Sequence, residues 1–285
     1  ISHDSVNRFL EREEYTPHDL YQEAIQHIDN NKLIVSIDDT VLDKPYSQHM
    51  DLVSYFWSGK HHRSVKGINL ITLYATDQNG QNIPINFRIY DKSEGKTKND
   101  YFMDMLSEVL SWGAKIQFIT GDSWYSSTGN LKTIRKHGIR FMFGIDCNRK
   151  VSPEKGQWFQ LRLLPNFHQG QVVWLKDFGF VQLFKTQLKE QQRFYIVYQD
   201  EDDLLSFEGF HELHSSHWKI EQYHRVIKQV CHIEKFQVRR SKLILNHIFS
   251  ALMAYVEIQK NQFEGIFENV YHWQKKLFRP MIKNF

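Results

Sequence analysis

Cysteine is scarce in this sequence of 285 residues, where only Cys147 and Cys231 occur. Two isolated cysteines form neither a disulfide framework nor one of the paired spacings that bind zinc. The sequence therefore excludes a disulfide-stabilised fold and a cysteine-based zinc site. A reducing cytoplasm is the simplest compartment for such a chain.

Long apolar runs and several catalytic signatures are also missing. No stretch approaches the roughly 18 consecutive apolar residues of a membrane-spanning helix, and no signal peptide is present, so we expect no membrane partner. There is no glycine-rich phosphate-binding loop, and ATP is therefore not implied. There is no nucleophile elbow either, which makes a Ser–His–Asp hydrolase a poor fit.

Charge of one sign is not in marked excess. The formal net charge is +3 and the sequence pI about 8.6, with acidic and basic residues interspersed along the chain. This balance permits nucleic-acid binding without requiring it. Because 41% of the residues are hydrophobic, the chain can bury one large core or two modest ones.

The first half of the sequence predicts short helices followed by strands. Residues 1–30 contain two helical segments, and Pro17 suits the first position of the second one. Residues 32–37 (KLIVSI) predict a strand that ends at Asp38-Asp39-Thr40, and residues 43–63 predict a polar loop. Two strands at 64–77 and 83–91, joined by the turn DQNGQN, complete an expected antiparallel meander.

The second half alternates between helix and strand and then changes character. A helix at 98–113 precedes a strand at 115–120, and a helix at 128–138 separates that strand from another at 139–146. This alternation is typical of parallel pairing. Strand-like segments without helices follow, and helices return at 209–231 and 240–262. We therefore expect four regions: N-terminal helices (1–30), the first part of an α/β core (31–146), a β-rich insertion (147–208), and completion of the core (209–285).

Carboxylates stand at three positions where rigid elements can bring them together. Asp38 or Asp39 follows one predicted strand, Asp122 follows another, and Glu221 lies on the helix HWKIEQYHRVIKQV. Strand ends can converge at one edge of a sheet, and a packed helix can add a third group. Carboxylate oxygens suit Mg²⁺ or Mn²⁺, and two such ions support phosphoryl chemistry on DNA.

The helix around Glu221 has a polar side and an apolar side. Ile220, Tyr223, Ile227 and Val230 share one face, which can dock on a core. The other face carries His214, His217, Glu221, His224, Arg225 and Lys228. An ordinary solvated helix with Glu–Arg and Glu–Lys pairs is the alternative explanation for this face.

Three motifs together resemble a known family. They are SIDDTVLDK, FITGDSWYS and WKIEQYHRVIKQ, and they are similar to those of the DDE transposases of bacterial insertion sequences. The resemblance covers nearly all of residues 30–260. The family pattern Tyr-x2-Arg-x3-Glu-x6-Lys is matched by Glu221 and Lys228, while His214 and His217 stand at the Tyr and Arg positions.

The resemblance implies a fold and a reaction. The implied fold is α/β, a ribonuclease-H-like mixed sheet core with an all-β insertion before the catalytic glutamate helix. The implied metal ligands and catalytic residues are Asp39, Asp122 and Glu221, holding two Mg²⁺ or Mn²⁺ ions. Family members have an acid directly before Thr or Ser, which favours Asp39 over Asp38. Neighbouring side chains on a strand point to opposite faces, so only one of the two reaches the metals.

The implied partner is double-stranded DNA, at the terminal inverted repeats of the element and at the target. The reaction is cleavage at the ends and strand transfer in the bacterial nucleoid, with a homodimer in the synaptic complex. Because the chain starts at Ile1, we expect missing upstream sequence that helps to recognise the ends. The candidate DNA contacts are Lys228, Arg225, His217, His214, Lys44, His61 and Arg63.

Several alternatives remain open on sequence alone. Lys44 is equally well explained as a surface lysine, and the loop 59–67 as plain solvated chain. Trp158 or Trp174 of the insertion is a candidate for stacking on an extruded base, as the family resemblance suggests. The chain could also be an inactive DNA-binding derivative of a transposase, or a stand-alone metal-dependent nuclease of the same fold.

Overall fold

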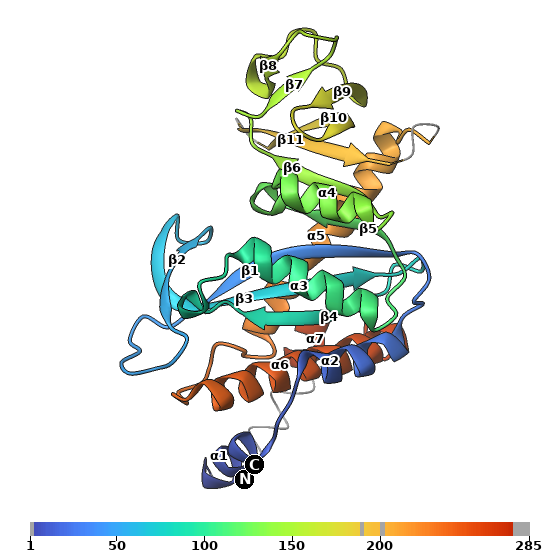
Figure 1. Ribbon diagram of the computed structural model, residues 1–285. Helices are drawn as coiled ribbons and strands as arrows, with labels where there is room; N and C mark the ends of the chain where they lie inside the picture. Colours follow the sequence, from blue (N-terminus) through green and yellow to red (C-terminus); the bar gives the residue numbers. More distant parts are fainter. Residues whose placement is uncertain (1–2, 189–190, 200–202, 276–285) are drawn as a thin grey trace.

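The computed structural model describes residues 3–188, 191–199 and 203–275 (Figure 1). Its strands are β1 (Leu33–Asp43), β2 (Ser54–Ser58), β3 (Arg63–Thr76), β4 (Asn82–Ile89), β5 (Ile116–Gly121), β6 (Arg140–Ile145), β7 (Lys150–Ser152), β8 (Phe159–Gln160), β9 (Gln171–Leu175), β10 (Gly179–Leu188) and β11 (Gln191–Tyr198). Its α-helices are α1 (His3–Arg12), α2 (Pro17–Ala24), α3 (Lys98–Ser111), α4 (Thr128–Lys136), α5 (Phe207–Gln229), α6 (Ser241–Phe263) and α7 (Val270–Trp273).

All the strands belong to one mixed sheet. Their order is β2-β3-β1-β5-β6-β11-β10-β9-β7-β8, with β4 also paired to β3. β1 and β4 run antiparallel to β3, whereas β1, β5 and β6 are mutually parallel neighbours. The predicted meander, the parallel pairing and the ribonuclease-H-like mixed α/β fold class are confirmed.

Two predictions in the first half of the chain are wrong. β1 does not end at residue 37 but continues to Asp43, because β3 pairs with it as far as Gly67. Asp38 and Asp39 therefore lie in the middle of a strand. The predicted loop 43–63 contains β2, whose short aromatic sequence SYFWS pairs with the start of β3. Such a short run shows too little periodicity to be told from a loop.

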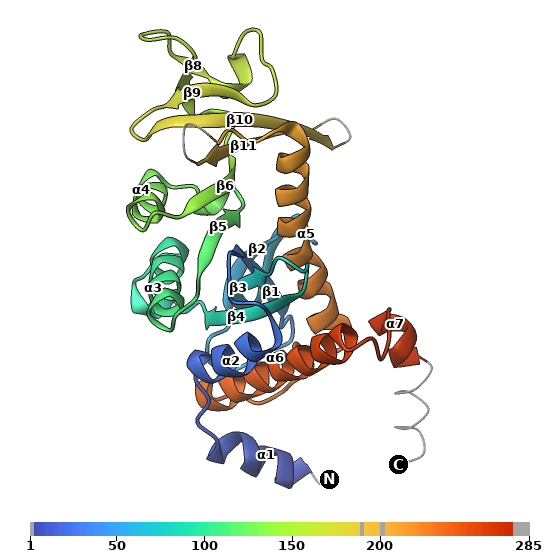
Figure 2. The same cartoon turned by 90° about the vertical axis from the view of Figure 1, so that its right-hand side faces the viewer.

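The strands that precede α5 extend the core sheet rather than forming a separate one. β11 pairs antiparallel with β6, and β10, β9 and β7 follow outward. Most of residues 156–164, within the region expected to hold strand-like segments, is not strand: only Phe159–Gln160 pairs, and Leu161–Leu163 form a 3-10 turn. Figure 2 shows these strands stacked beyond β6, with α5 leading back to the core.

Helices cover both faces of the core sheet (Figure 2). α3 and α4 lie on one face and α5 lies on the other, while α2 and α6 pack beside β4. α3 begins with a capping box in which the Thr97 hydroxyl accepts from the Asp100 amide and the Asp100 carboxylate accepts from the Thr97 amide. Within the described ranges, no helix is both long and apolar enough to cross a bilayer.

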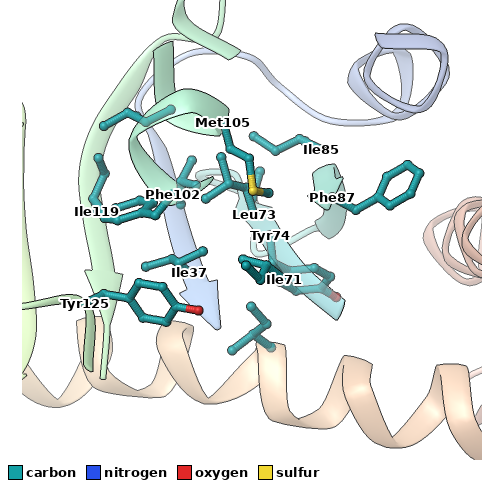
Figure 3. Close-up of a cluster of buried hydrophobic side chains, with 14 of the residues drawn as sticks. Ile37, Ile71, Leu73, Tyr74, Ile85, Phe87, Phe102, Met105, Ile119 and Tyr125 are labelled. Carbon is teal, nitrogen blue, oxygen red and sulfur yellow. The ribbon is translucent and has the colours of Figure 1, made fainter. Parts of the chain in front are cut away.

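Part of the main core lies between the sheet and α3. Ile37 of β1, Ile119 of β5, and Phe102 and Met105 of α3 gather in one buried cluster (Figure 3). The opposite face of β1 is polar where it meets α5. There the Ser36 hydroxyl lies 2.8 Å from the Thr120 hydroxyl, and the ring of His217 lies 3.1 Å from Thr120. The two faces of β1 therefore carry different chemistry.

We predict that Gly121→Ala destabilises the fold, by about 1–3 kcal/mol as is typical of overpacking. A Cβ at this position, at the end of β5, would lie 2.6 Å from the Phe143 ring and 2.8 Å from the Ile37 side chain. Urea unfolding measures the change. Gly129→Ala is the matched control, because its Cβ meets open helix surface and should stabilise α4 by about 0.5–1 kcal/mol. Equal stability of both variants would contradict the packing argument.

Candidate active site

Asp38 and Asp39 point to opposite faces of β1. Asp38 pairs with Thr72 of β3, which contacts Tyr223 of α5, and so it faces the α5 side. One Asp38 oxygen accepts from the Asp39 amide at 2.8 Å, and the other lies 3.6 Å from Nδ1 of His224. The structure therefore directs Asp38, not Asp39, toward the helix that carries Glu221.

Asp38, Glu221 and His224 form a compact group. Each offers one potential ligand atom, and these atoms all lie within 4.8 Å of one another. Glu221 and His224 are three residues apart on α5, a spacing that puts both side chains on the same face of a helix. Asp38 comes from the strand beneath them. Two elements far apart in the sequence thus build one candidate metal centre.

Asp39 has a different environment on the α3 side of the sheet. One of its oxygens accepts from Lys98 Nζ at 2.7 Å and from Asn69 Nδ2 at 2.6 Å. The other accepts from the Tyr125 hydroxyl at 2.9 Å. Both oxygens are therefore engaged within the protein. The structure does not bring Asp39 together with Glu221, although Asp39 lies close enough to Asp122 to affect its ionisation.

Asp122 follows β5 and begins a short 3-10 turn, Ser123–Tyr125. One of its oxygens accepts from the Trp124 amide at 2.9 Å. Burial, followed by the negative charge of Asp39, raises the pKa of Asp122 to about 6. The Asp122 residue is nevertheless exposed on one side, so that solvent or a substrate phosphate can reach it.

The carboxylates repel one another across the site. Burial raises the pKa of Asp38 well above its usual range, and the charges of Glu221, Asp122 and Asp39 raise it further. Glu221 is exposed as a residue, yet the surrounding protein desolvates its carboxylate and raises its pKa. A divalent cation would relieve this repulsion, and carboxylate oxygens are the ligands that Mg²⁺ and Mn²⁺ prefer. The residues present therefore fit the metal ions that the sequence predicts.

Burial shifts the pKa values of three histidines of α5 downward, which favours their neutral rings. Burial lowers the pKa of His217 to about 4, and burial lowers the pKa of His214, which lies 3.0 Å from the Tyr195 hydroxyl. Burial also lowers the pKa of His224 to about 3. The predicted phosphate contacts of His214 and His217 would thus be made by uncharged rings already near the hydroxyls of Tyr195 and Thr120.

Cationic side chains surround Glu221. The charges of Arg193, Arg225 and Lys228 each lower its pKa, against the effect of burial. Arg225 is exposed, whereas Lys228 Nζ donates to the Val41 carbonyl at 2.7 Å. Sequence reasoning missed Arg193, which lies on β11, because nothing in its local pattern connects it to α5.

The loop before β3 lies beside this cationic surface. His61 Nε2 is 2.9 Å from an Asp43 oxygen, and the neighbouring Lys60 reaches the same carboxylate. Arg63, at the start of β3, is exposed. The charge of Lys60 also acts on Lys228, so the loop is close to α5.

Lys44 is neither an ordinary surface lysine nor free to contact phosphate, which corrects both expectations. Its ammonium is buried, donates to the carbonyls of Glu234 and Phe236 at 2.8 and 2.7 Å, and lies 3.4 Å from the Phe236 ring centre. The segment that follows α5 folds over it. Sequence reasoning also missed Lys98, Asn69 and Tyr125, whose roles depend on contacts across the sheet.

Comparison with known proteins is consistent with this site. The family described as Transposase DDE domain matches residues 29–256. No curated protein matches the chain. Two structures of Marinitoga piezophila Argonaute are similar, one with 5′ OH guide RNA and target DNA and one with 5′ OH guide RNA.

The likeness to Argonaute is weak. The first structure has a TM-score of 0.26 and 10% identity, covering 76% of this chain and 28% of that one. The second has a TM-score of 0.25 and 11% identity, covering 67% and 26%. This chain thus spans about a quarter of the length of Argonaute, and no functional conclusion follows from the likeness.

We predict that Lys44 makes stability rise with pH in the alkaline range. Burial lowers the pKa of Lys44 to about 8, whereas an unfolded chain holds a lysine near 10.4. Between these values the unfolded state binds more protons, so the contribution of Lys44 to the free energy of unfolding increases as pH rises. Urea unfolding at pH 7.5 and 9.5 should show wild type gaining stability relative to Lys44→Met. The exposed Lys132→Met is the control, and a difference independent of pH would contradict the burial argument.

Proposed function

This chain belongs to the transposase DDE domain family, and from this premise we propose that it is an insertion-sequence transposase. It cuts DNA at the ends of the element and joins the freed 3′ ends to target DNA, using divalent metal ions. The observation that carries the proposal is that Asp38 of β1 lies beside Glu221 of α5, with potential ligand atoms within 4.8 Å, while the charge of Asp122 after β5 also acts on Asp38.

We assign the first carboxylate of the metal site to Asp38. The family resemblance favours Asp39, but the geometry places Asp38 beside Glu221 and gives Asp39 three protein partners. Asp39 would then act indirectly, by binding Lys98 and Tyr125 and by raising the pKa of Asp122. Asp122 and Glu221 keep the roles that the sequence predicts for them.

Different side chains would bind the metal ions and the DNA. When bound, two Mg²⁺ or Mn²⁺ ions supply Lewis-acid activation of the attacking oxygen and stabilisation of the leaving one. Asp38, Asp122 and Glu221 would hold these ions. Arg225 and Arg193, whose charges both act on Glu221, would bind backbone phosphates of the DNA, as would Lys228 and Arg63. Because water and then the freed 3′-hydroxyl would be the attacking oxygens, no protein nucleophile is needed.

The substrate would be duplex DNA, first at the terminal inverted repeats and then at the target. The β-rich insertion (147–208) would contact the same DNA, since its residue Arg193 already acts on Glu221. Trp158 and Trp174 of the insertion are exposed and remain candidates for stacking on a base. Two DNA ends must be held together, so we propose a homodimer on DNA within the bacterial nucleoid.

A joining assay tests the function. Linear duplexes cloned from the two flanks of the gene serve as donors, and a supercoiled plasmid serves as the target. With Mg²⁺ or Mn²⁺ we expect cleavage at a fixed donor position and covalent donor–plasmid products, both abolished by EDTA. Cleavage without joining would identify a nuclease instead. DNA binding without cleavage under all metal conditions would identify an inactive DNA-binding derivative.

Substitution separates the two neighbouring aspartates. We expect Asp38→Asn to lower the cleavage rate on the order of 10⁴-fold, as loss of a member of a catalytic unit does. Asp39→Asn should lower it only about 10–100-fold, as loss of an indirect contact does. Single-turnover cleavage of the donor duplex measures both rates, and circular dichroism confirms folding. The reverse order of effects would assign the metal to Asp39.

A further inference from the structure

We propose that His224 is a direct nitrogen ligand of the metal ion held between Asp38 and Glu221. This inference rests on the proposed function, because it concerns an ion of the same site. It changes the chemistry of that ion, since three carboxylates alone would offer only oxygen. The argument comes from the position of the ring, its unmet hydrogen bonding and the spacing of its partners.

The distances suit two ligands of a shared ion better than a hydrogen bond. Nδ1 of His224 lies 3.6 Å from an oxygen of Asp38, beyond the usual N–H···O range of about 2.7–3.2 Å. Two ligand atoms that each lie about 2.1 Å from one ion are about 3.0–4.2 Å apart for angles between 90° and 180°. The potential ligand atoms of Asp38, Glu221 and His224 lie within 4.8 Å of one another. Small side-chain rotations would bring all three within the range of a shared ion.

No hydrogen bond explains the burial of the His224 ring. The residue is 6% exposed, and its Nδ1 faces Asp38 beyond hydrogen-bond distance. Buried polar atoms without partners are uncommon, and an ion at Nδ1 would give this nitrogen a partner. Nε2, on the far side of the ring, also has no hydrogen-bond partner among the described residues, but an ion at Nδ1 does not contact it. His217, two turns earlier on α5, differs because its ring lies 3.1 Å from the Thr120 hydroxyl.

Helix geometry supports a shared role for Glu221 and His224. Residues three apart on a helix lie on one face, and a Glu-x-x-His pair supplies two ligands to the ions of di-iron and di-manganese carboxylate proteins. Here the pair is read directly from the sequence of α5, and Asp38 faces it from β1. Imidazole binds transition metals more readily than it binds Mg²⁺ or Ca²⁺. The proposed site therefore favours Mn²⁺ over Mg²⁺ more strongly than an all-carboxylate site would.

Pulsed EPR of the full chain loaded with Mn²⁺ tests the ligand directly. We expect a coupling from directly bound ¹⁴N in the wild type, and its replacement by a ¹⁵N coupling when histidine is ¹⁵N-labelled. His224→Gln should lose the nitrogen coupling and lower the preference for Mn²⁺ over Mg²⁺ by about tenfold or more. His217→Gln is the matched control on the same helix and should keep the coupling.

The outcomes separate a failure of the His224 proposal from a failure of the proposed function. Bound Mn²⁺ without any nitrogen coupling in the wild type overturns the role of His224 and leaves the carboxylate site intact. A coupling that survives in His224→Gln also overturns it. His224→Glu is a second variant that replaces nitrogen by oxygen, and it should bind Mn²⁺ without the coupling. Failure of every folded variant and the wild type to bind Mn²⁺, with or without a short DNA duplex, would instead overturn the metal site of the proposed function.

Discussion

Negative charge gathered around Asp38 is the constraint on which the site depends. Glu221, Asp122 and Asp39 lie close enough for their charges to raise the pKa of Asp38, in surroundings that partly remove it from water. The charge of Asp39 likewise raises the pKa of Asp122. The two faces of the sheet differ in how this negative charge is compensated. On the α3 side, Lys98, Asn69 and Tyr125 bind Asp39. On the α5 side, no lysine or arginine contacts Asp38 within the described part of the chain, so the negative charge there has no cationic side chain against it.

Much of this site could be predicted from local pattern. The apolar run 115–120 marks a buried strand, so an acid directly after it stands at a sheet edge, as Asp122 does. The apolar stripe of α5 likewise docks on the core through Ile220, Tyr223 and Ile227, and Glu221, outside this stripe, offers an oxygen within 4.8 Å of Asp38. Both inferences need only the periodicity of a single element. They succeed because each functional residue is placed by the element that carries it.

The choice between Asp38 and Asp39 could not be predicted from a single element. Alternation along a strand says that the two side chains diverge, but it does not say which face α5 covers. That face is decided by the pairing of β1 with β3 and β5 and by the docking of α5, all of which join distant segments. The extension of β1 to Asp43, the existence of β2 and the burial of Lys44 escape sequence analysis for the same reason. Each depends on a partner supplied from elsewhere in the chain.

The strands before α5 contribute to the position of Glu221 as well as to the surface. β11 pairs with β6, and β6 is parallel to β5, the strand that leads to Asp122. The inserted strands are therefore continuous with the core sheet, in which β1 carries Asp38, and the polypeptide enters α5 from this sheet. α5 is then anchored at its start by Phe210 against Phe184 and Tyr195 of these strands, and further along by Tyr223 against Tyr74 of the core. Glu221 lies between the two anchors. A displacement of the inserted strands would therefore move Glu221 relative to Asp38 and Asp122 and change the geometry of the proposed metal site.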